Sequence, residues 1–344
     1  MAIAPGMNAP LRLRLDGDAL VHNWRWLKAA GGDAACGAAV KANGYGLGAV
    51  DVTTRLLAAG CRDFFVATWD EAAEVERLLP QDASLSVFHG VRAADMSAAL
   101  DSRARPVLNT PEQVARWQPT GRACDVMIDT GINRLGLAPG ADLSGLKIDT
   151  LLSHLASADQ DVAQNGRQLE LFRDAVSALP ARRASLANSA AICLGPEYHF
   201  GLTRPGLALY GGLPRGEAAG HIRPVVSVDA EVLQRRRIAA GESVGYNATF
   251  TADQPMDLAI LNIGYADGYL RAFSGKGTAG EGRFPVIGRV SMDLIAIDVS
   301  TAPDVAEGDW IAIDYDLPSA AAISGLSQYE MLTLLGHRFE RLWH

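Results

Sequence analysis

Short apolar runs alternate with longer amphipathic stretches over residues 11–216, and this alternation limits the folds open to the chain. Within 69–79, for example, Ala72 and Val75 share one helical face, opposite Glu71 and Glu74. Repeated strand and helix units of this length predict a parallel sheet. So many units within about two hundred residues favour a closed barrel over an open doubly wound sheet. The runs predicted to be strands are 64–67, 85–88, 106–108, 125–128, 150–153 and 183–186.

The pattern changes after residues 212–224, a segment that contains proline and glycine. Short alternating runs are then separated by glycine, proline and aspartate, and helical periodicity is scarce until 327–335. These runs are 225–232, 258–263, 284–290, 294–299 and 310–313. We therefore predict an α/β chain with two domains, a (β/α)8 TIM-like barrel at 11–216 and a C-terminal, mostly β domain at 222–344.

Composition narrows the range of functions. The 344 residues are 49% hydrophobic, which is ample for a substantial core. A net charge of -8 and a pI near 5.4 argue against a nucleic-acid partner. No apolar run is long enough to span a bilayer, and the first ten residues lack the pattern of a secretory signal. We therefore expect a cytoplasmic protein without a membrane partner.

The four cysteines, Cys36, Cys61, Cys124 and Cys193, are widely scattered. A zinc site or a redox motif would need close pairs, so we predict no metal site. We expect the thiols to be small buried side chains in a reducing compartment.

One lysine stands at the end of an apolar run. Lys41 follows the run that ends at Val40 and is itself followed by Gly44, Gly46 and Gly48, as where a buried strand passes into a tight loop. Its amine could form a Schiff base with an aldehyde cofactor, because a desolvated lysine shifts its pKa and becomes nucleophilic. A solvated lysine closing a strand is the alternative reading. The glycine spacing does not match a dinucleotide-binding fingerprint.

Polar residues follow the other predicted strands of the barrel. In a barrel the residues after each strand gather at one face, so residues far apart in sequence become neighbours. The set combines an amine, an imidazole, two guanidinium groups and a hydroxyl beside a glycine turn. Its members are Lys41 with Tyr45, residues 129–134, His154 with Asp159, residues 188–189 and residues 204–206.

Eight motifs together make the chain resemble the alanine racemases. They occur in the order and spacing of that family, and the resemblance runs from Lys41 to Tyr329 and Glu330. The motifs are residues 40–46, 129–136, 153–159, 188–190, 204–211, 244–250, 263–269 and 288–293.

The resemblance implies an isomerase that uses pyridoxal phosphate and works as a homodimer. It would interconvert L-alanine and D-alanine and supply D-alanine for the peptidoglycan of a bacterial cell wall. Lys41 would hold the cofactor as an internal aldimine and then act as one of two acid/base groups. Tyr246 would be the other, reaching the opposite face of the cofactor from the partner subunit. Racemisation requires both faces, since a proton leaves one side of the α-carbon and returns to the other.

The resemblance also implies the groups that bind the cofactor. Arg204 would face the pyridine nitrogen, and because a guanidinium only donates hydrogen bonds, that nitrogen would stay unprotonated. An unprotonated ring is a poorer electron sink, which leaves less opportunity for side reactions. His154 would stack on the ring and hydrogen-bond Arg204. The phosphate would be bound by Tyr45, Ser189, Tyr329 and the backbone N–H groups of Gly206 and Leu207.

For the substrate, the resemblance points to residues in both domains. Arg134 and the backbone at Met292 would receive the alanine carboxylate. Further residues would line the way in: Tyr265, Asp159, Arg271 and Arg289.

The chain departs from the family pattern at three positions. Many members carry a carbamylated lysine two residues before the Asp-Thr-Gly motif, where this chain has Met127. Methionine cannot be carbamylated, so Arg134 must be oriented by other means, such as Asn133, an anion or another polar side chain. Asn247 replaces a usual glycine, and Ser291 stands where cysteine is frequent. These changes bear on substrate selectivity and turnover.

Other functions remain open at this stage. A racemase of broader specificity, acting on serine or basic amino acids, would share the same motifs. A barrel decarboxylase would require an acidic residue in place of Arg204. A cofactor carrier without enzymatic activity would lack the second domain that holds Tyr246 and Met292.

Overall fold

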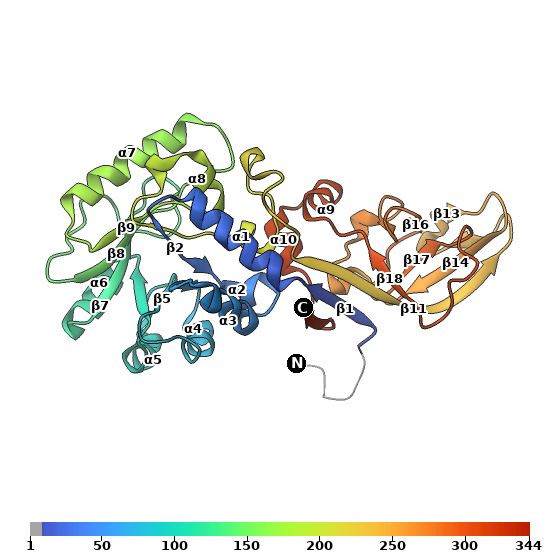
Figure 1. Ribbon diagram of the computed structural model, residues 1–344, viewed down its shortest axis with the longest axis horizontal. Coiled ribbons are helices and arrows are strands. Elements are labelled where there is room, and N and C mark those ends of the chain that lie inside the picture. The colour runs from blue at the N-terminus through green and yellow to red at the C-terminus, as the bar shows by residue number, and fades with distance from the viewer. Residues whose placement is uncertain (1–8) are drawn as a thin grey trace. The chain divides into compact units, whose positions relative to one another are not determined.

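The computed structural model describes residues 9–344, which form two compact units (Figure 1). One unit is Ala19–Arg223, and the other combines residues 9–18 with Pro224–His344. The expectation about a secretory signal concerns the first ten residues, of which only Ala9 and Pro10 are among the described residues. Among residues 9–344, no helix has both the length and the apolar character needed to cross a membrane.

Parallel strands form a closed barrel in the first unit. Seven strands pair in the order β3-β4-β5-β6-β7-β8-β9, and β10 pairs in parallel with β2, which β3 continues. Gly201 N–H donates to Ala184 O (3.1 Å) and Arg204 N–H to Ala187 O (2.8 Å), which joins the β10 segment to the β9 segment. The eight-stranded wall confirms the predicted barrel. The strands are β2 Ala35–Cys36, β3 Ala38–Ala39, β4 Asp63–Val66, β5 Ser84–Val87, β6 Arg105–Leu108, β7 Ala123–Met127, β8 Lys147–Leu152, β9 Arg183–Ser185 and β10 Leu202–Thr203.

Helix α1 precedes the first barrel strand, and the other helices of this unit follow barrel strands in the chain (Figure 1). In α3 the small and aliphatic side chains Ala49, Val52 and Leu56 are buried, and Gly60 ends the helix in a left-handed conformation (φ +106°). The helices are α1 Gly17–Ala30, α2 Lys41–Tyr45, α3 Ala49–Ala59, α4 Trp69–Glu76, α5 Met96–Asp101, α6 Pro111–Trp117, α7 Ala163–Ala178 and α8 Ser189–Leu194.

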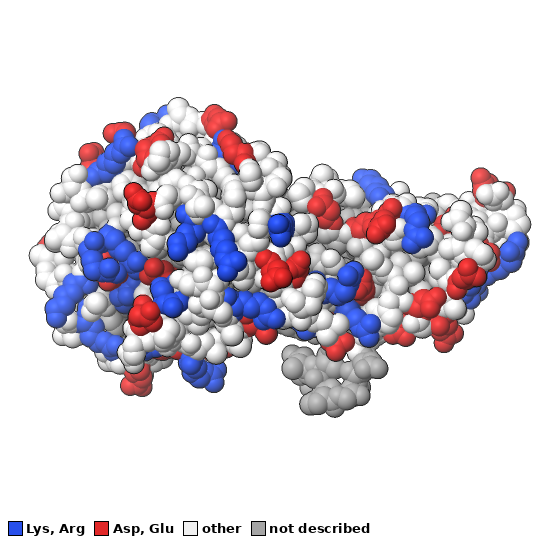
Figure 2. All heavy atoms as spheres, viewed as in Figure 1, with Lys and Arg blue, Asp and Glu red and all other residues white. Residues whose placement is uncertain are grey.

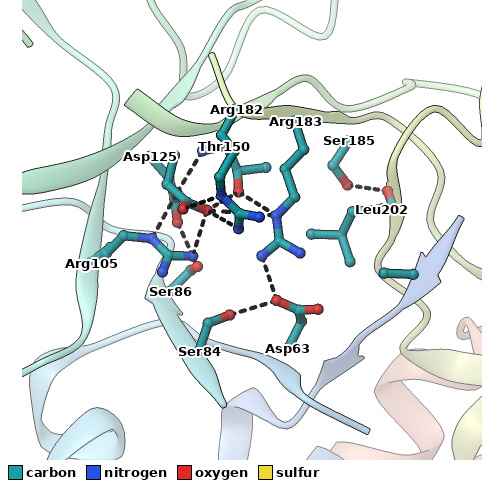
Figure 3. Close-up of polar contacts among 12 residues, drawn as sticks. Asp63, Ser84, Ser86, Arg105, Asp125, Thr150, Arg182, Arg183, Ser185 and Leu202 are labelled. Carbon is teal, nitrogen blue, oxygen red and sulfur yellow. Dashed lines mark hydrogen bonds and ion pairs between the residues drawn. The ribbon is translucent and has the colours of Figure 1, made fainter. Parts of the chain in front are cut away.

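A polar network lies near the amino ends of the barrel strands (Figure 3). Asp125 accepts hydrogen bonds from Arg105 Nε (3.0 Å) and Ser86 Oγ (2.6 Å), and Arg183 of β9 binds Asp63 of β4. The Arg183–Asp63 pair joins strands 120 residues apart. The network is at the opposite end of the strands from the predicted site, so the two ends of the barrel have separate chemistry.

The second unit is built on an eight-stranded sheet in the order β14-β17-β16-β15-β18-β11-β1-β19. An additional β14–β11 pairing closes the first six of these strands on themselves. A two-stranded sheet, β12 with β13, and two helices complete the unit. The elements are β1 Leu11–Leu15, β11 Val226–Ile238, β12 Ser243–Val244, β13 Phe250–Thr251, β14 Met256–Leu261, β15 Thr278–Ala279, β16 Phe284–Ile287, β17 Ile295–Asp298, β18 Trp310–Ile313, β19 Glu340–Trp343, α9 Leu317–Ser324 and α10 Gln328–Thr333.

The strand at 11–15 pairs within the second unit. β1 runs antiparallel to β11 and parallel to β19, and its Arg14 pairs with Asp229 at 2.6 Å. Its leucines are buried and its arginines are not, which suits a strand with one face on a core. The domain limits 11–216 and 222–344 stay a prediction. The structure shows that the strand at 11–15, which lies inside the first of these ranges, pairs with strands of the second unit.

Surface charge is mixed on the face shown in Figure 2. Basic and acidic side chains are interspersed there, as expected for a chain with 31 basic and 39 acidic residues.

Candidate active site

Lys41 is the first residue of α2, separated by one residue from the end of β3, and the turn that follows it is left-handed. Ala42, Asn43 and Gly44 have φ values of 52°, 53° and 60°, and Tyr45 has 54°. Each non-glycine residue in this region costs roughly 1 kcal/mol or more, so the surroundings must hold the turn. Asn43 contributes by accepting the Ala49 N–H at 2.9 Å through its side-chain oxygen.

Glu71 of α4 also holds this turn. One carboxylate oxygen accepts the Ala42 N–H at 2.7 Å, and the other accepts the Ala67 N–H at 2.7 Å. Glu71 is at the same time the third residue of a capping box with Thr68. A single carboxylate therefore connects the start of α4 to the backbone beside Lys41.

The surroundings of Lys41 favour its neutral amine. The side chain is half-buried, and Nζ lies 5.9 Å from the centroid of the Phe88 ring. Burial and then the charge of Arg134 lower the lysine pKa, while Glu71 opposes them. A neutral amine is the form that attacks a carbonyl carbon.

Tyr45, Ser189 and Gly206 form a close cluster. Tyr45 is buried and stacks on Tyr210 with ring centroids 4.6 Å apart. A Cβ on Gly206 would lie 2.2 Å from the Tyr45 hydroxyl, so a side chain at position 206 would displace the phenol. Ser189 Oγ accepts the N–H groups of Gly206 (2.9 Å) and Ala208 (3.2 Å). Because Ser189 Oγ accepts both N–H groups, its own proton stays available to donate, which suits an anion at this point.

Arg204 is a buried guanidinium that binds neutral oxygens. It is 4% exposed, and it donates to Ser185 Oγ at 2.6 Å and to Ser153 O at 2.7 Å. Burial lowers its pKa to about 10, which still leaves it charged at neutral pH. These two bonds use two of the five N–H donors of the guanidinium, so further donors remain for an acceptor.

His154 lies in a neighbourhood of positive charge. Burial, followed by the charges of Arg204, Arg134 and Lys41, lowers its pKa to about 3. The imidazole is therefore neutral at working pH. The charges of Lys41, Arg134 and Arg204 all act on this one histidine, although the three residues follow different strands of the barrel. The expected hydrogen bond between His154 and Arg204 stays a prediction, and the bonds that Arg204 makes among the described residues are those to Ser185 Oγ and the Ser153 carbonyl.

Arg134 is exposed on the loop after β7. Asp129 Oδ1 organises this loop by accepting three backbone N–H groups, those of Gly131 (2.8 Å), Ile132 (3.0 Å) and Asn133 (3.2 Å). Met127 is buried at the end of β7, and its carbonyl accepts the Leu137 N–H at 2.8 Å. Asp159, on the loop after β8, is exposed.

The second unit carries the remaining predicted residues. Tyr246 is 65% exposed, and Asn247 next to it has φ +62°, a conformation that explains why glycine suits that position. Met292 is 53% exposed, and its carbonyl accepts the Ala266 N–H at 3.0 Å. Arg271 lies over the Tyr265 ring at 5.0 Å.

Two further predicted residues lie elsewhere in this unit. Arg289 is half-buried, and Tyr329, on α10, is 40% exposed.

Sequence reasoning missed Glu71 and Gln168 as parts of the site. The Thr68-to-Glu71 spacing is a capping-box signal, but it indicates a helix start and says nothing of Ala42. Gln168 is a buried residue of α7, and no local signal in the sequence points to a role in the site.

Comparisons with family models, with related sequences and with solved structures all point to one family. Residues 15–214 match the family model for the alanine racemase N-terminal domain, and 225–343 match that for the C-terminal domain. An alanine racemase of Rhodospirillum rubrum is 42% identical over 96% of this chain and 94% of its own.

Two relatives from Agrobacterium fabrum carry different designations. The one named biosynthetic is 40% identical, over 97% of this chain and 93% of its own length. The one named catabolic is 39% identical, over 96% of this chain and 91% of its own length.

A solved structure agrees with these relatives. The alanine racemase of Bartonella henselae, with covalently bound pyridoxal phosphate, superposes with a TM-score of 0.91 at 34% identity, over 98% of this chain and all of that one.

Proposed function

Because this chain belongs to the alanine racemase family, as the family models and relatives show, we propose that it interconverts L-alanine and D-alanine with pyridoxal phosphate as cofactor. The observation that carries the proposal is the buried Arg204, which binds neutral oxygens and keeps donors for an acceptor. A decarboxylase would need a carboxylic acid at this position. An arginine supports proton exchange at the α-carbon instead.

The residues of the barrel fit pyridoxal phosphate. Lys41 offers an amine with a lowered pKa, and Arg204 offers a donor for the ring nitrogen. Tyr45, Ser189 and the backbone N–H groups of Gly206 and Leu207 would hold the phosphate, and the neutral His154 would lie on the ring. From the second unit, Tyr329 would join the phosphate site.

Proton movement would be the work of two side chains. When bound, pyridoxal phosphate supplies a covalent attachment for an amine and an electron-withdrawing ring that makes the α-hydrogen of the amino acid acidic. Lys41 Nζ would hold the cofactor at rest and, once released, carry the proton on one face of the α-carbon. The Tyr246 hydroxyl would carry it on the other face. Arg134, the backbone of Met292 and Tyr265 would hold the substrate.

We place Tyr246 of one subunit at the Lys41 of another, so the active enzyme would be a homodimer. The high exposure of Tyr246 supports this arrangement, because an exposed aromatic side chain suits an interface. We further propose that the enzyme is cytoplasmic and supplies D-alanine for peptidoglycan. Relatives named biosynthetic and catabolic match almost equally, so gene deletion in the host is the test: the proposal requires that the strain grow only with added D-alanine.

The reaction is tested by circular dichroism of the cofactor-loaded protein with L-alanine, L-serine, L-lysine and L-arginine. We expect the optical signal to fall to zero fastest with alanine. Lys41→Ala and Tyr246→Phe should both abolish racemisation, whereas the controls Lys28→Ala and Tyr198→Phe should retain it. Release of carbon dioxide would indicate a decarboxylase, and faster loss with another amino acid would indicate a racemase of different specificity. Undiminished racemisation in both directions by Tyr246→Phe would exclude the two-base mechanism.

A further inference from the structure

The position of Arg134 needs an explanation, since Met127 cannot supply the polar contact that the family's lysine makes. Asp129 shapes the loop that carries Arg134, but its three bonds are local to that loop. These three bonds do not connect the loop to the next one, which follows β8 and carries His154. A contact that spans both loops would add to the direct Thr130–Ser153 contact between them and fix their relative positions.

Gln168 of α7 makes that contact. Its Nε2 donates to Thr130 Oγ1 (3.3 Å) in the first loop and to the His154 carbonyl (3.0 Å) in the second. Its Oε1 accepts the Ala156 N–H at 2.9 Å. The side chain is 1% exposed, so water does not compete for these bonds.

The connection continues to Arg204. Thr130 Oγ1 lies 2.7 Å from Ser153 Oγ, and because Thr130 accepts from Gln168 it can donate its own proton to the serine. The Ser153 carbonyl in turn accepts from Arg204 at 2.7 Å. Thr130 and Ser153 are both buried. One amide therefore connects the loops that carry Arg134 and His154 to Arg204.

A second amide on the same face of α7 repeats the pattern. Gln164 lies four residues before Gln168, and residues at this spacing share a helix face. Its Nε2 donates to Gly131 O at 3.3 Å, and its Oε1 accepts from Ser157 Oγ at 3.4 Å. These bonds are longer and the side chain is half-buried, so Gln168 is the stronger of the two.

We propose that Gln168 is a positioning residue that sets Arg134 and His154 relative to each other, in the role left open by Met127. The inference rests on the proposed function, because it assumes that Arg134 binds the substrate carboxylate. Gln168 itself touches neither substrate nor cofactor. It acts by fixing the two loops.

The first test is independent of activity. Gln168→Met keeps the length of the side chain and removes all three hydrogen bonds. In the protein without cofactor, we expect hydrogen exchange to accelerate together in peptides 129–137 and 154–160. Acceleration in only one of the two peptides, or in neither, would overturn the bridging role. This result stands whether or not the wild type racemises alanine.

The matched control is Gln113→Met. Gln113 of α6 is also a buried amide between two loops, accepting from Asn109 N–H (2.8 Å) and donating to His89 O (3.0 Å). Its loops follow β5 and β6 and carry no proposed substrate group. The Gln113→Met variant should lose about as much stability as Gln168→Met, without faster hydrogen exchange in peptides 129–137 or 154–160.

The second test measures the substrate. Loss of a buried hydrogen-bonded partner should raise the KM for alanine roughly tenfold in Gln168→Met, with a smaller change in kcat. In an Arg134→Lys background the same change should raise KM far less, because the affected contact is already impaired. Equal effects in both backgrounds, or an equal KM effect in Gln113→Met, would overturn the proposal.

A second variant covers the case in which Gln168→Met does not fold. Thr130→Val removes the hydroxyl that accepts from Gln168, and Thr130→Ser keeps it. We expect Thr130→Val to raise KM and Thr130→Ser to restore it. If both variants behaved alike, the hydroxyl would have no positioning role. If the wild type failed to racemise alanine, the proposed function would be wrong. The hydrogen-exchange result would still show whether Gln168 holds the two loops together.

Discussion

The charge of His154 is set by its surroundings. Burial, followed by the charges of three cationic side chains, lowers its pKa to about 3 from an ordinary 6.5. The folded protein therefore excludes a proton that the unfolded chain binds below pH 6.5. The contribution of His154 to stability is full above pH 6.5 and is lost as the pH falls towards 3.

Replacement of His154 should make this dependence visible. Between pH 7 and pH 5, the free energy of unfolding should fall less steeply in His154→Gln than in wild type, by up to roughly 1.4 kcal/mol per pH unit below 6.5. Denaturant titration of the protein without cofactor measures both slopes. Equal slopes would mean that the folded protein protonates His154 as readily as the unfolded chain does.

At the scale of elements, α4 and α2 share Glu71. Glu71→Ala should remove the acceptor of the Ala42 and Ala67 N–H groups and loosen the left-handed turn beside Lys41. We expect a loss of about 1 kcal/mol in stability and weaker retention of pyridoxal phosphate. Thr68→Ala removes the N-cap of the same helix and leaves the Ala42 contact, so it should lose stability alone. Thermal unfolding and equilibrium dialysis of the cofactor separate the two effects, and equal cofactor retention would contradict the role of Glu71.

The network at the amino ends of the strands holds buried charge (Figure 3). Burial raises the pKa of Asp125, and Arg105 opposes this by pairing with it at 3.0 Å. Arg105→Met would leave Asp125 buried without its cation and should reduce stability by about 3–5 kcal/mol. Arg182→Met is the control, since that side chain is 62% exposed where it pairs with Asp149 and should contribute less than about 1 kcal/mol. Similar denaturation midpoints for the two variants would contradict the importance of burial.

At the scale of the whole molecule, the shared active site is tested by mixing two inactive variants. If Lys41 of one subunit works with Tyr246 of its partner, a hybrid of Lys41→Ala and Tyr246→Phe subunits contains one intact site. Random pairing in an equal mixture should then restore activity at about a quarter of all sites. The measurement is racemisation by a co-refolded mixture, compared with each variant refolded alone. A mixture as inactive as its parents would place both groups in one subunit.

Much of the fold and part of the site were predictable because their signals are local. Strand and helix periodicity lies within a few neighbouring residues, so the alternation over 11–216 predicted the barrel that the structure confirms. The position of Lys41 after an apolar run was equally visible. The strand at 11–15 was not assigned to the second unit, since nothing within it reveals that Arg14 will meet Asp229, 215 residues away.

By itself, the sequence determined the two kinds of secondary-structure pattern, the residue types available for chemistry and, through its motifs, the family. Only the tertiary structure decided what those residues do to one another. The lowered pKa of Lys41, the neutral His154, the neutral partners of Arg204 and the bridge through Gln168 all depend on burial and on contacts between separate strands and helices. Hydrogen bonds and desolvation depend on distances in space, and distance along the chain does not encode them.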